Sequence, residues 1–290
     1  MSTKPSELYY LCNGRKDRPM KLSIITVNLN NRDGLQKTID SVVSQTFRDF
    51  EWIVIDGGST DGSKELIEQY ADHFAYWVSE PDKGVYNAMN KGVSNAQGDY
   101  LNFMNSGDVF SDNNVLTNVF AEEHYEDILY GDWILQLEDR EIRVSDPNKF
   151  NLLNLFKECI CHQSMFIKKE FLKEKGYDET YGIMADWKRW LEAVISGKTG
   201  CYLPILICVF DCSGISFQFN EKYRREENRL FDEDLKQFHA LKRYARNEDI
   251  IELHMFYDKS LHYAKLLKNT LKIIKRLEKY RLFCKKVLHR

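Results

Sequence analysis

Residues 51–62 read EWIVIDGGSTDG, an apolar run that stops at an acid and continues into two glycines and a short polar turn. The apolar run predicts a buried strand over 51–55. The segment after the turn, 63–70, predicts a helix because its apolar residues recur at helical spacing. A strand, a glycine turn and a helix in direct succession are typical of a parallel α/β unit.

The same unit recurs on both sides of this segment. Further strands and helices are predicted at 22–27, 34–43, 75–79, 85–94 and 100–104. Because short connections join them, we expect an α/β fold with a mostly parallel, Rossmann-like central sheet and helices on both faces. Polar turns follow the strands, and in open sheets of this kind ligands bind at the carboxyl edge.

The pattern changes after Asp112. Shorter strands, a hairpin and one helix are predicted, at 128–130, 133–137, 142–144, 164–167, 186–196 and 203–210. From Asn220 onward the sequence predicts only helices. The expected organisation is an N-terminal extension, an α/β domain and a helical C-terminal region, over residues 1–20, 21–215 and 216–290.

Charge is distributed unevenly along the chain, although the net charge is only −3. Residues 260–290 carry ten lysines and arginines against one acid, with apolar residues between them at helical spacing. A basic amphipathic helix of this kind can lie on an anionic membrane surface, and packing against the rest of the protein is the alternative. The small net charge argues against a nucleic-acid partner.

The sequence also gives an expectation about location. The first 20 residues lack the apolar run of a signal peptide, and no segment reaches the ~18 uninterrupted apolar residues of a spanning helix. Seven cysteines, without the dense pairing of small secreted proteins, favour a reducing compartment. We expect a cytoplasmic protein, attached peripherally to the inner face of the cytoplasmic membrane through its basic tail.

Three carboxylates occupy places where chemistry is expected. Asp56 ends the strand 51–55, where a carboxylate can accept the N–H of a pyrimidine ring. Asp108 closes the turn NSGD, residues 105–108, where it is either a turn residue or a ligand that shares Mg²⁺ or Mn²⁺ with diphosphate oxygens. Asp186 begins a helix, as its cap or as a general base. Neither common phosphate-loop signature occurs.

The sequence resembles glycosyltransferase family 2 in four ordered blocks spread over residues 21–212. The blocks are LSIITVN (22–28), VIDGGSTDG (54–62), SEPDKGVYNAMNKG (79–92), and AQGDY (96–100) followed by NSGD (105–108). The resemblance implies a GT-A type fold for residues 21–215. It also implies an inverting transfer from a nucleotide sugar to an acceptor hydroxyl, with Mg²⁺ or Mn²⁺ as the cofactor.

The resemblance implies a role for several residues by their positions. It places nucleotide-sugar-binding residues at Thr26, Asn28, Asp56, Lys83 and Ser106. Asp108 would be the metal-binding carboxylate, and Asp186 would be the catalytic base. The sequence departs from the commoner pattern in two places. Gly57 stands where many members have a second Asp, and the turn 105–108 holds only one carboxylate.

A branch of the family that acts in surface-polysaccharide assembly resembles the chain more closely, in the NSGD turn and in a Cys-His-Gln segment at 161–163. The resemblance makes four residues candidates for the sugar or acceptor pocket, Asp132, His162, Gln163 and Trp187. A structural hydrogen bond is the alternative for the first three.

The expected activity is transfer of a hexose from a nucleoside-diphosphate sugar, with a UDP-sugar as the first choice. The expected acceptor is a hydroxyl of a lipid-linked glycan in cell-surface polysaccharide synthesis. One alternative is a non-catalytic nucleotide-sugar-binding or assembly protein of the same fold. A sugar nucleotidyltransferase is a second alternative, but it would need a glycine-rich phosphate loop that residues 28–32 do not supply.

Overall fold

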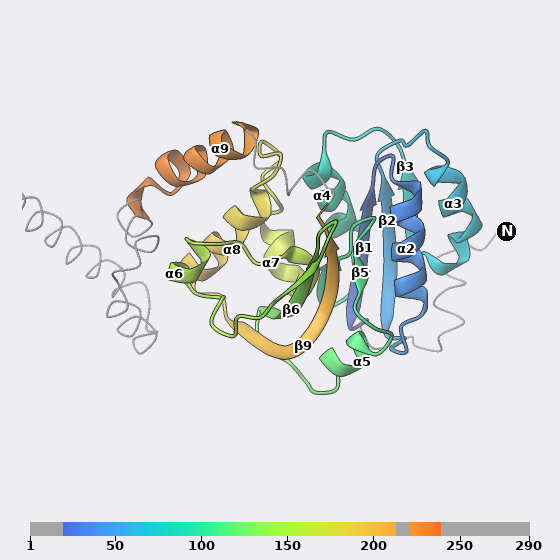
Figure 1. Ribbon diagram of the computed structural model, residues 1–290, viewed down its shortest axis with the longest axis horizontal. Coiled ribbons are helices and arrows are strands. Elements are labelled where there is room, and N and C mark those ends of the chain that lie inside the picture. The colour runs from blue at the N-terminus through green and yellow to red at the C-terminus, as the bar shows by residue number, and fades with distance from the viewer. Residues whose placement is uncertain (1–19, 213–220, 239–290) are drawn as a thin grey trace, which may run out of the picture. The chain divides into compact units, whose positions relative to one another are not determined.

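The computed structural model describes two compact units of the chain (Figure 1). The described residues of the first unit are 20–147, 160–186 and 199–212. Those of the second unit are 148–159, 187–198 and 221–238. Residues 1–19, the predicted domain boundary near residue 215 and the basic tail at 260–290 lie outside the described residues.

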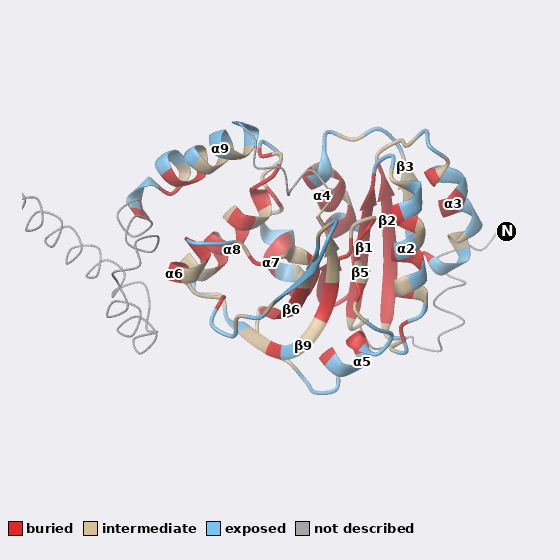
Figure 2. Ribbon diagram, in the orientation of Figure 1, coloured by how far each residue is buried: buried red, intermediate tan, exposed pale blue. Residues whose placement is uncertain are grey.

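Four parallel strands form one half of a nine-stranded sheet in the first unit. In spatial order they are β3 (Tyr76–Ser79), β2 (Phe50–Asp56), β1 (Leu22–Asn28) and β4 (Tyr100–Phe103). Every residue of β1 and β2 is buried (Figure 2), as expected for parallel strands covered on both faces. Each strand agrees with its predicted range to within one residue at either end.

Three helices cover this half of the sheet, α2 (Arg32–Val43), α3 (Ser63–Gln69) and α4 (Val85–Asn95). The chain steps in one direction from β1 to β2 to β3 and then returns across the sheet to β4. Right-handed crossovers therefore place α2 and α3 on one face and α4 on the other (Figure 1). A short 3-10 helix, η1 (Ala71–His73), precedes β3. The predicted α/β fold is confirmed.

The other half of the sheet is mixed. The sequence predicted its hairpin, 133–137 with 142–144, which the antiparallel pairing of these residues confirms, but not the remaining pairings. It contains β5 (Val109–Phe110), β6 (Ile128–Gln136), β7 (Glu141–Val144), β8 (Met165–Lys168) and β9 (Gly200–Asp211). β6 pairs in parallel with β9, whereas β8 runs antiparallel to both β4 and β6. β7 pairs antiparallel with β6, and β5 pairs antiparallel with β9. Helices α5 (Val115–Val119) and α7 (Lys169–Glu174) and the 3-10 turn η2 (His162–Ser164) complete the first unit.

The described residues of the second unit are mainly helical. Its elements are α6 (Leu152–Leu155), most of α8 (Ala185–Ile195), α9 (Glu221–Asn228), the π-helix η4 (Arg229–Asp234) and the 3-10 turn η5 (Lys236–Phe238). Aromatic rings form its core, where Phe156 contacts both Phe231 and Phe238. The first two residues of α8, Ala185 and Asp186, belong to the first unit.

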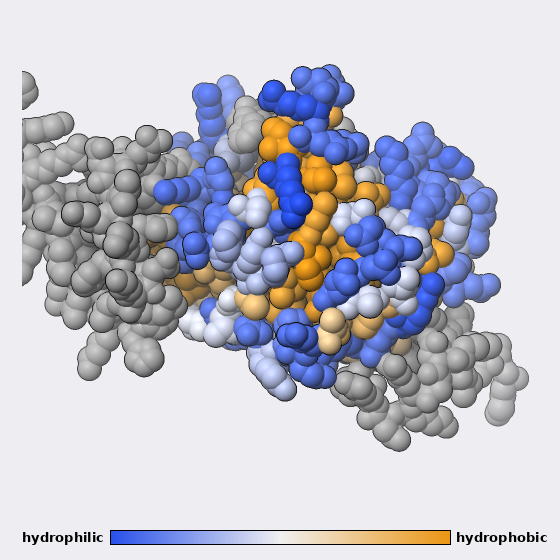
Figure 3. Space-filling view, turned by 60° about the horizontal axis from the view of Figure 1, so that its bottom comes forward, coloured by the Kyte–Doolittle hydropathy of each residue, from blue (hydrophilic) through white to orange (hydrophobic). Residues whose placement is uncertain are grey.

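Hydrophobic residues on the surface gather in a strip between hydrophilic ones on the face that Figure 3 shows. Separately, Leu29 is 56% exposed, directly after the end of β1. Exposed apolar side chains are common on globular proteins, so Leu29 matters here for its position rather than for its exposure alone.

None of the helices in the described ranges combines the length and the apolar character that crossing a membrane requires.

Candidate functional site

The carboxyl ends of β1, β2 and the turn after β4 meet at one edge of the sheet. Asn28 and Asp56 are direct partners in the β1–β2 register. The backbone N–H of Ser106 donates to Val27 O at 3.1 Å, and Asn31 Nδ2 donates to Ser106 O at 3.0 Å. The structure therefore brings three of the predicted nucleotide-sugar-binding residues to this edge.

Asp56 is fully buried at the end of β2 and is the centre of a hydrogen-bond cluster. It accepts from the side chains of Asn28 at 2.7 Å, Ser59 at 2.5 Å and Ser79 at 2.6 Å, and from the backbone N–H groups of Gly58 and Ser59. Burial raises the pKa of Asp56, but these donors outweigh burial and leave the pKa below its ordinary value. Asp56 therefore stays ionised and holds the glycine turn. A ligand N–H would have to displace one of the present donors.

Asn28 offers an acceptor at the same edge. Its Nδ2 donates to Asp56, while its buried Oδ1 has no hydrogen-bond partner among the described residues. Leu29 follows it, and the Leu29 Cδ1 atom is 3.2 Å from the position that a Cβ on Gly57 would take. A buried acceptor beside an exposed apolar side chain suits a flat ring with an N–H on its edge. We did not predict a role for Leu29 from the sequence.

Gly57 packs against the loop that precedes α4. A Cβ at this position would lie 2.6 Å from Asp82 Oδ2, so the Asp82 carboxylate occupies the space that a larger residue would need. Asp82 Oδ1 accepts from the Gly84 backbone N–H at 2.8 Å, which fixes the loop. Lys83, predicted to lie toward the diphosphate, is an exposed residue of this loop. A second acid at position 57, as in the commoner pattern, would bring two carboxylates together unless Asp82 moved.

Three predicted site residues make structural contacts, Thr26 from the nucleotide-sugar set and Asp132 and Trp187 from the sugar or acceptor pocket. Thr26 is fully buried in the sheet, and its Oγ1 accepts from the Trp52 indole at 3.0 Å. Asp132 accepts from Tyr202 at 2.6 Å and from Arg143 at 2.6 Å across β6, β9 and β7. Burial raises the pKa of Asp132, but the bonds from Tyr202 and Arg143 bring it below its ordinary value.

Trp187, the third of these residues, lies in the core of the second unit. Its indole N–H donates to Leu155 O at 2.5 Å, and its ring packs edge-on against Phe231. Both the polar and the apolar parts of the side chain are therefore engaged inside that unit. These contacts give Trp187 a packing role, and its predicted pocket role stays a prediction.

Asp108, the predicted metal ligand, is a buried carboxylate at the end of the turn after β4. Its side chain is held from two sides, because Gln163 Nε2 donates at 2.6 Å and the backbone N–H of Asp211 donates at 3.0 Å. Burial raises the pKa of Asp108 to about 7, despite these two donors. A divalent cation would favour the ionised form of this carboxylate.

Asp211 is a second acid near Asp108 that we did not predict from the sequence. It ends β9, and its Oδ2 lies 3.3 Å from the position that a Cβ on Gly107 would take. The signal was available, since Asp211 follows an apolar strand as Asp56 does. Within the described ranges, no cluster of three or more His, Cys, Asp or Glu side chains could hold a metal ion. The residues fit a cation only if diphosphate oxygens and water supply most of its ligands.

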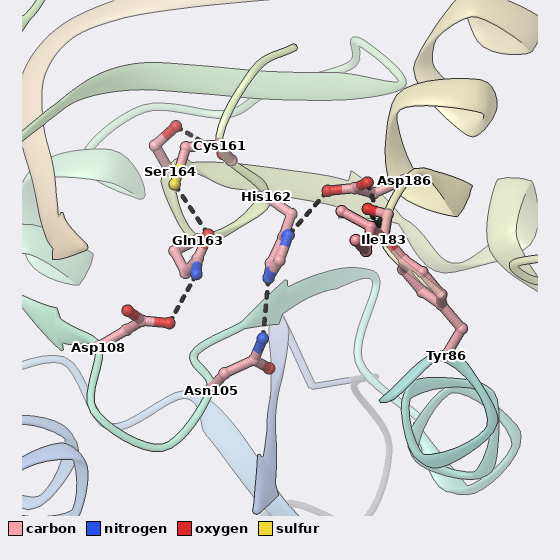
Figure 4. A network of polar contacts seen from close by, with 9 residues as sticks. All are labelled: Tyr86, Asn105, Asp108, Cys161, His162, Gln163, Ser164, Ile183 and Asp186. Carbon is pink, nitrogen blue, oxygen red and sulfur yellow. Dashed lines mark hydrogen bonds and ion pairs between the residues drawn. The ribbon is translucent and has the colours of Figure 1, made fainter. Parts of the chain in front are cut away.

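Asp186, the predicted base, lies in the polar network that Figure 4 shows. Its Oδ2 is 3.0 Å from Nδ1 of His162, and its Oδ1 accepts from the Tyr86 hydroxyl at 2.9 Å. The side chains of Asp186 and His162 are each 13% exposed. Nε2 of His162 lies 2.9 Å from Nδ2 of Asn105, in the same turn that carries Asp108. The structure thus joins the predicted base to the predicted metal-binding turn.

The raised pKa of Asp108 predicts how cation binding depends on pH. Because a cation must displace the proton, the affinity for Mn²⁺ in the presence of UDP should fall about tenfold per pH unit below pH 7. Titration calorimetry between pH 6 and pH 8 measures this, and equal affinity at pH 6 and pH 7.5 would contradict it.

The same pKa shift makes the stability of the metal-free protein depend on pH. Asp108 contributes fully to the free energy of unfolding below about pH 4, and this contribution is lost as pH rises through about 7.

Comparison with known sequences identifies related proteins. The family model of glycosyl transferase family 2 matches residues 23–182. An uncharacterized glycosyltransferase of Mycobacterium tuberculosis strain H37Rv is 36% identical over 201 residues, which are 67% of this chain and 76% of that protein. A PGL/p-HBAD biosynthesis glycosyltransferase of Mycobacterium bovis BCG is 35% identical over 57% of this chain and 66% of that protein.

Solved structures share the fold at low sequence identity. Staphylococcus aureus TarS 1–349 in complex with UDP-GlcNAc superposes with a TM-score of 0.60 at 18% identity, over 81% of this chain and 69% of that one. The mannosyltransferase PcManGT from Pyrobaculum calidifontis, in complex with GDP-Man and Mn²⁺, gives 0.53 at 17% identity, over 84% and 73%. The likeness shows a GT-A type fold.

Proposed function

The chain belongs to glycosyltransferase family 2, and we propose that it transfers a sugar from a UDP-sugar to an acceptor hydroxyl with inversion at the anomeric carbon. One observation carries the proposal. Asp108 and Asp186 are held by two consecutive residues, Gln163 and His162, beside the sheet edge formed by Asn28 and Asp56. A cation-binding carboxylate, a base and an edge suited to a nucleobase are the groups that such a transfer needs.

In the proposed reaction the acceptor oxygen forms a bond to the anomeric carbon as the bond from that carbon to the diphosphate oxygen breaks. Asp186 takes the proton of the acceptor hydroxyl, and attack from the face opposite the leaving group inverts the configuration. Asp108 and Lys83 lie on the side of the leaving diphosphate. A bound Mg²⁺ or Mn²⁺ ion would stabilise the negative charge that develops there.

The proposed sugar donor and acceptor follow from the hydrogen-bonding groups of the site and from related proteins. The free Oδ1 of Asn28 can accept the N–H of a uracil ring, and TarS, which shares the fold, is known in complex with UDP-GlcNAc. A relative at 35% identity is a PGL/p-HBAD biosynthesis glycosyltransferase. We therefore propose a UDP-sugar as the donor. For the acceptor we propose a lipid-linked glycan of the cell envelope, with surface-polysaccharide synthesis as the process.

Such an acceptor would bring the enzyme to a membrane surface. The basic sequence at 260–290 supports peripheral attachment to the inner face of the cytoplasmic membrane. Co-sedimentation with anionic vesicles should be stronger for the full chain than for a version that ends near residue 260. Equal partitioning of the two proteins would exclude this role of the tail.

A ligand screen tests the donor and the cation together. UDP with Mn²⁺ should raise the melting temperature more than UDP alone or Mn²⁺ alone, because each ligand supplies part of the other's site. At a concentration 100 times the Kd, binding adds about 2.7 kcal/mol to the free energy of unfolding. GDP with Mn²⁺ is the comparison for base preference. If no nucleoside diphosphate changes the melting temperature, the proposed donor site is wrong.

A further inference from the structure

Two consecutive residues of the turn η2 contact the two carboxylates to which the proposed function gives different roles. His162 Nδ1 lies 3.0 Å from Asp186 Oδ2, and Gln163 Nε2 lies 2.6 Å from Asp108 Oδ2 (Figure 4). The two carboxylates come from distant parts of the sequence and from opposite sides of this turn. The geometry of η2 therefore sets both the distance and the relative orientation of the two carboxylates.

The turn is itself fixed to the sheet. Asn102, in the buried strand β4, donates through Nδ2 to the backbone oxygens of Gln163 and Met165, each at 2.9 Å. Ser164 Oγ donates to Cys161 O at 2.8 Å and closes the turn on itself. A positioning element must be more rigid than the groups that it orients, and these bonds supply that rigidity.

The side-chain orientation of Gln163 is determined by its neighbour. Cys161 Sγ lies 2.8 Å from Gln163 Oε1, and a thiol can donate its S–H to an amide oxygen. With Oε1 engaged in this way, the amide N–H groups of Gln163 face Asp108. Gln163 is 2% exposed, so water does not compete strongly for these groups.

The tautomer of His162 that fits this network is set by Asn105. In the described orientation of the Asn105 amide, Nδ2 lies 2.9 Å from His162 Nε2, which is then the acceptor. The ring proton is then on Nδ1, where it can donate to Asp186. The Tyr86 hydroxyl lies 2.9 Å from the other oxygen of Asp186 and 2.5 Å from Ile183 O, so these two acceptors share its single proton. The two side-chain oxygens of Asp186 thus face Tyr86 and His162.

We propose that His162 and Gln163 form a pair of positioning residues, in which His162 orients the base Asp186 and Gln163 orients the metal-binding Asp108. The proposal rests on the proposed function, because the roles of the two carboxylates come from it. Its distinctive consequence is that the two side chains serve separate steps. Loss of His162 impairs proton removal from the acceptor, and loss of Gln163 impairs cation and diphosphate binding.

Two substitutions in the full chain test this separation. His162→Phe should lower UDP release from UDP-GlcNAc, with water as the acceptor, about 10- to 100-fold and weaken Mn²⁺-dependent UDP affinity less than Gln163→Leu does, although it also removes the partner of Asn105 in the turn that carries Asp108. Gln163→Leu should weaken Mn²⁺-dependent UDP affinity about 10- to 100-fold. UDP release is followed by a coupled assay, and affinity by titration calorimetry.

The split between kcat and KM for UDP release gives a readout that a purely structural role would not change. Tyr86 of α4 and His162 of η2 face Asp186. His162→Phe removes the N–H donor that orients this carboxylate, so kcat should fall while the KM for UDP-GlcNAc stays near its wild-type value. Gln163→Leu should raise the KM for UDP-GlcNAc instead. His162→Asn keeps an N–H near the position of Nδ1 and should recover part of the activity.

Glu51→Gln is the matched control for lost stability. Glu51 is a buried carboxylate near the amino end of β2, where it accepts from Ser23 Oγ at 2.6 Å and from the Gln97 backbone N–H at 2.5 Å. This variant should melt earlier and still keep UDP release and Mn²⁺-dependent UDP affinity. If both η2 variants lose both properties to the same extent, or if neither loses any, the proposed pair is overturned.

A measurement without substrate separates this proposal from the proposed function. In ¹⁵N-histidine-labelled full chain, the nitrogen shifts of His162, assigned with His162→Asn, should show the proton on Nδ1. A proton on Nε2 would overturn the positioning of Asp186, whatever the enzyme transfers. If the wild type releases no UDP from any UDP-sugar but shows the Nδ1 proton and the Gln163→Leu binding defect, the proposed function fails and the described pairing stands.

Discussion

Asp186→Asn should lower sugar transfer by about 10²- to 10⁴-fold, the range that removal of a general base typically costs. An amide cannot take the proton of the acceptor hydroxyl, and the described network offers His162 only as a donor to this position. Mn²⁺-dependent UDP affinity should stay within about twofold of the wild type, because Asp186 does not contact Asp108 or Asp56 in the described hydrogen bonds. Initial rates of transfer and calorimetric titration measure the two quantities.

Asp139→Asn is a suitable control for this variant. Asp139 is exposed in the β6–β7 hairpin, and the same chemical change there should leave transfer and binding unaltered. Normal turnover of Asp186→Asn would remove Asp186 from the role of base. A melting temperature far below that of the control would show that the variant disturbs the contacts with Tyr86 and His162, and Asp186→Glu would then test the carboxylate itself.

Asp108→Asn should weaken Mn²⁺-dependent UDP binding by at least about 10- to 100-fold, the range seen when only a partner of a metal ligand is lost. Transfer should fall with it. The reason is that Asp108 and the nearby Asp211 are the acids at this turn in the described structure, so an amide at position 108 leaves a single carboxylate. Calorimetric titration of UDP with and without Mn²⁺ measures the effect.

Although Asp108→Asn should weaken UDP binding, the metal-free variant should be at least as stable as the wild type. Burial raises the pKa of Asp108 to about 7, so above this pH the folded protein must hold a buried charge. Replacing it by an amide removes that cost, and the metal-free variant should melt at the same or a higher temperature at pH 8. A lower melting temperature together with unchanged UDP affinity would mean that Asp108 serves the fold and not the cation.

The parallel half of the fold could be predicted from the sequence because each strand there is an apolar run followed by a polar turn and an amphipathic helix. In the second half the hairpin and most of the strands were also predicted, but the remaining strand pairings could not be, for two physical reasons. β5 is two residues long, too short to show a period. β6 was predicted as two pieces because its register with β9 shifts around Asp132, where a polar residue interrupts the apolar pattern.

The sequence predicted individual residues of the candidate site, but not the contacts between them. Asp56 and Asp108 stand at strand ends, a signal that is visible in the sequence. The contacts that orient the site join residues far apart, 55 positions for Asp108 and Gln163 and 24 for Asp186 and His162. No local pattern reports such contacts. Residues that are adjacent in the sequence can also differ in their surroundings. Trp187 directly follows Asp186, but its side chain packs inside the second unit.

The central claim is that the site transfers a sugar, with Asp186 as the base. The most direct measurement follows label from UDP-[¹⁴C]GlcNAc and other labelled UDP-sugars into a bacterial lipid extract with Mn²⁺, for the wild type and Asp186→Asn side by side. We predict that the wild type moves label into the lipid fraction and releases one UDP per sugar, and that Asp186→Asn does neither while it still binds UDP. UDP-sugar binding without any transfer by the wild type, or equal transfer by both proteins, would contradict the claim and favour a non-catalytic nucleotide-sugar-binding protein or a different base.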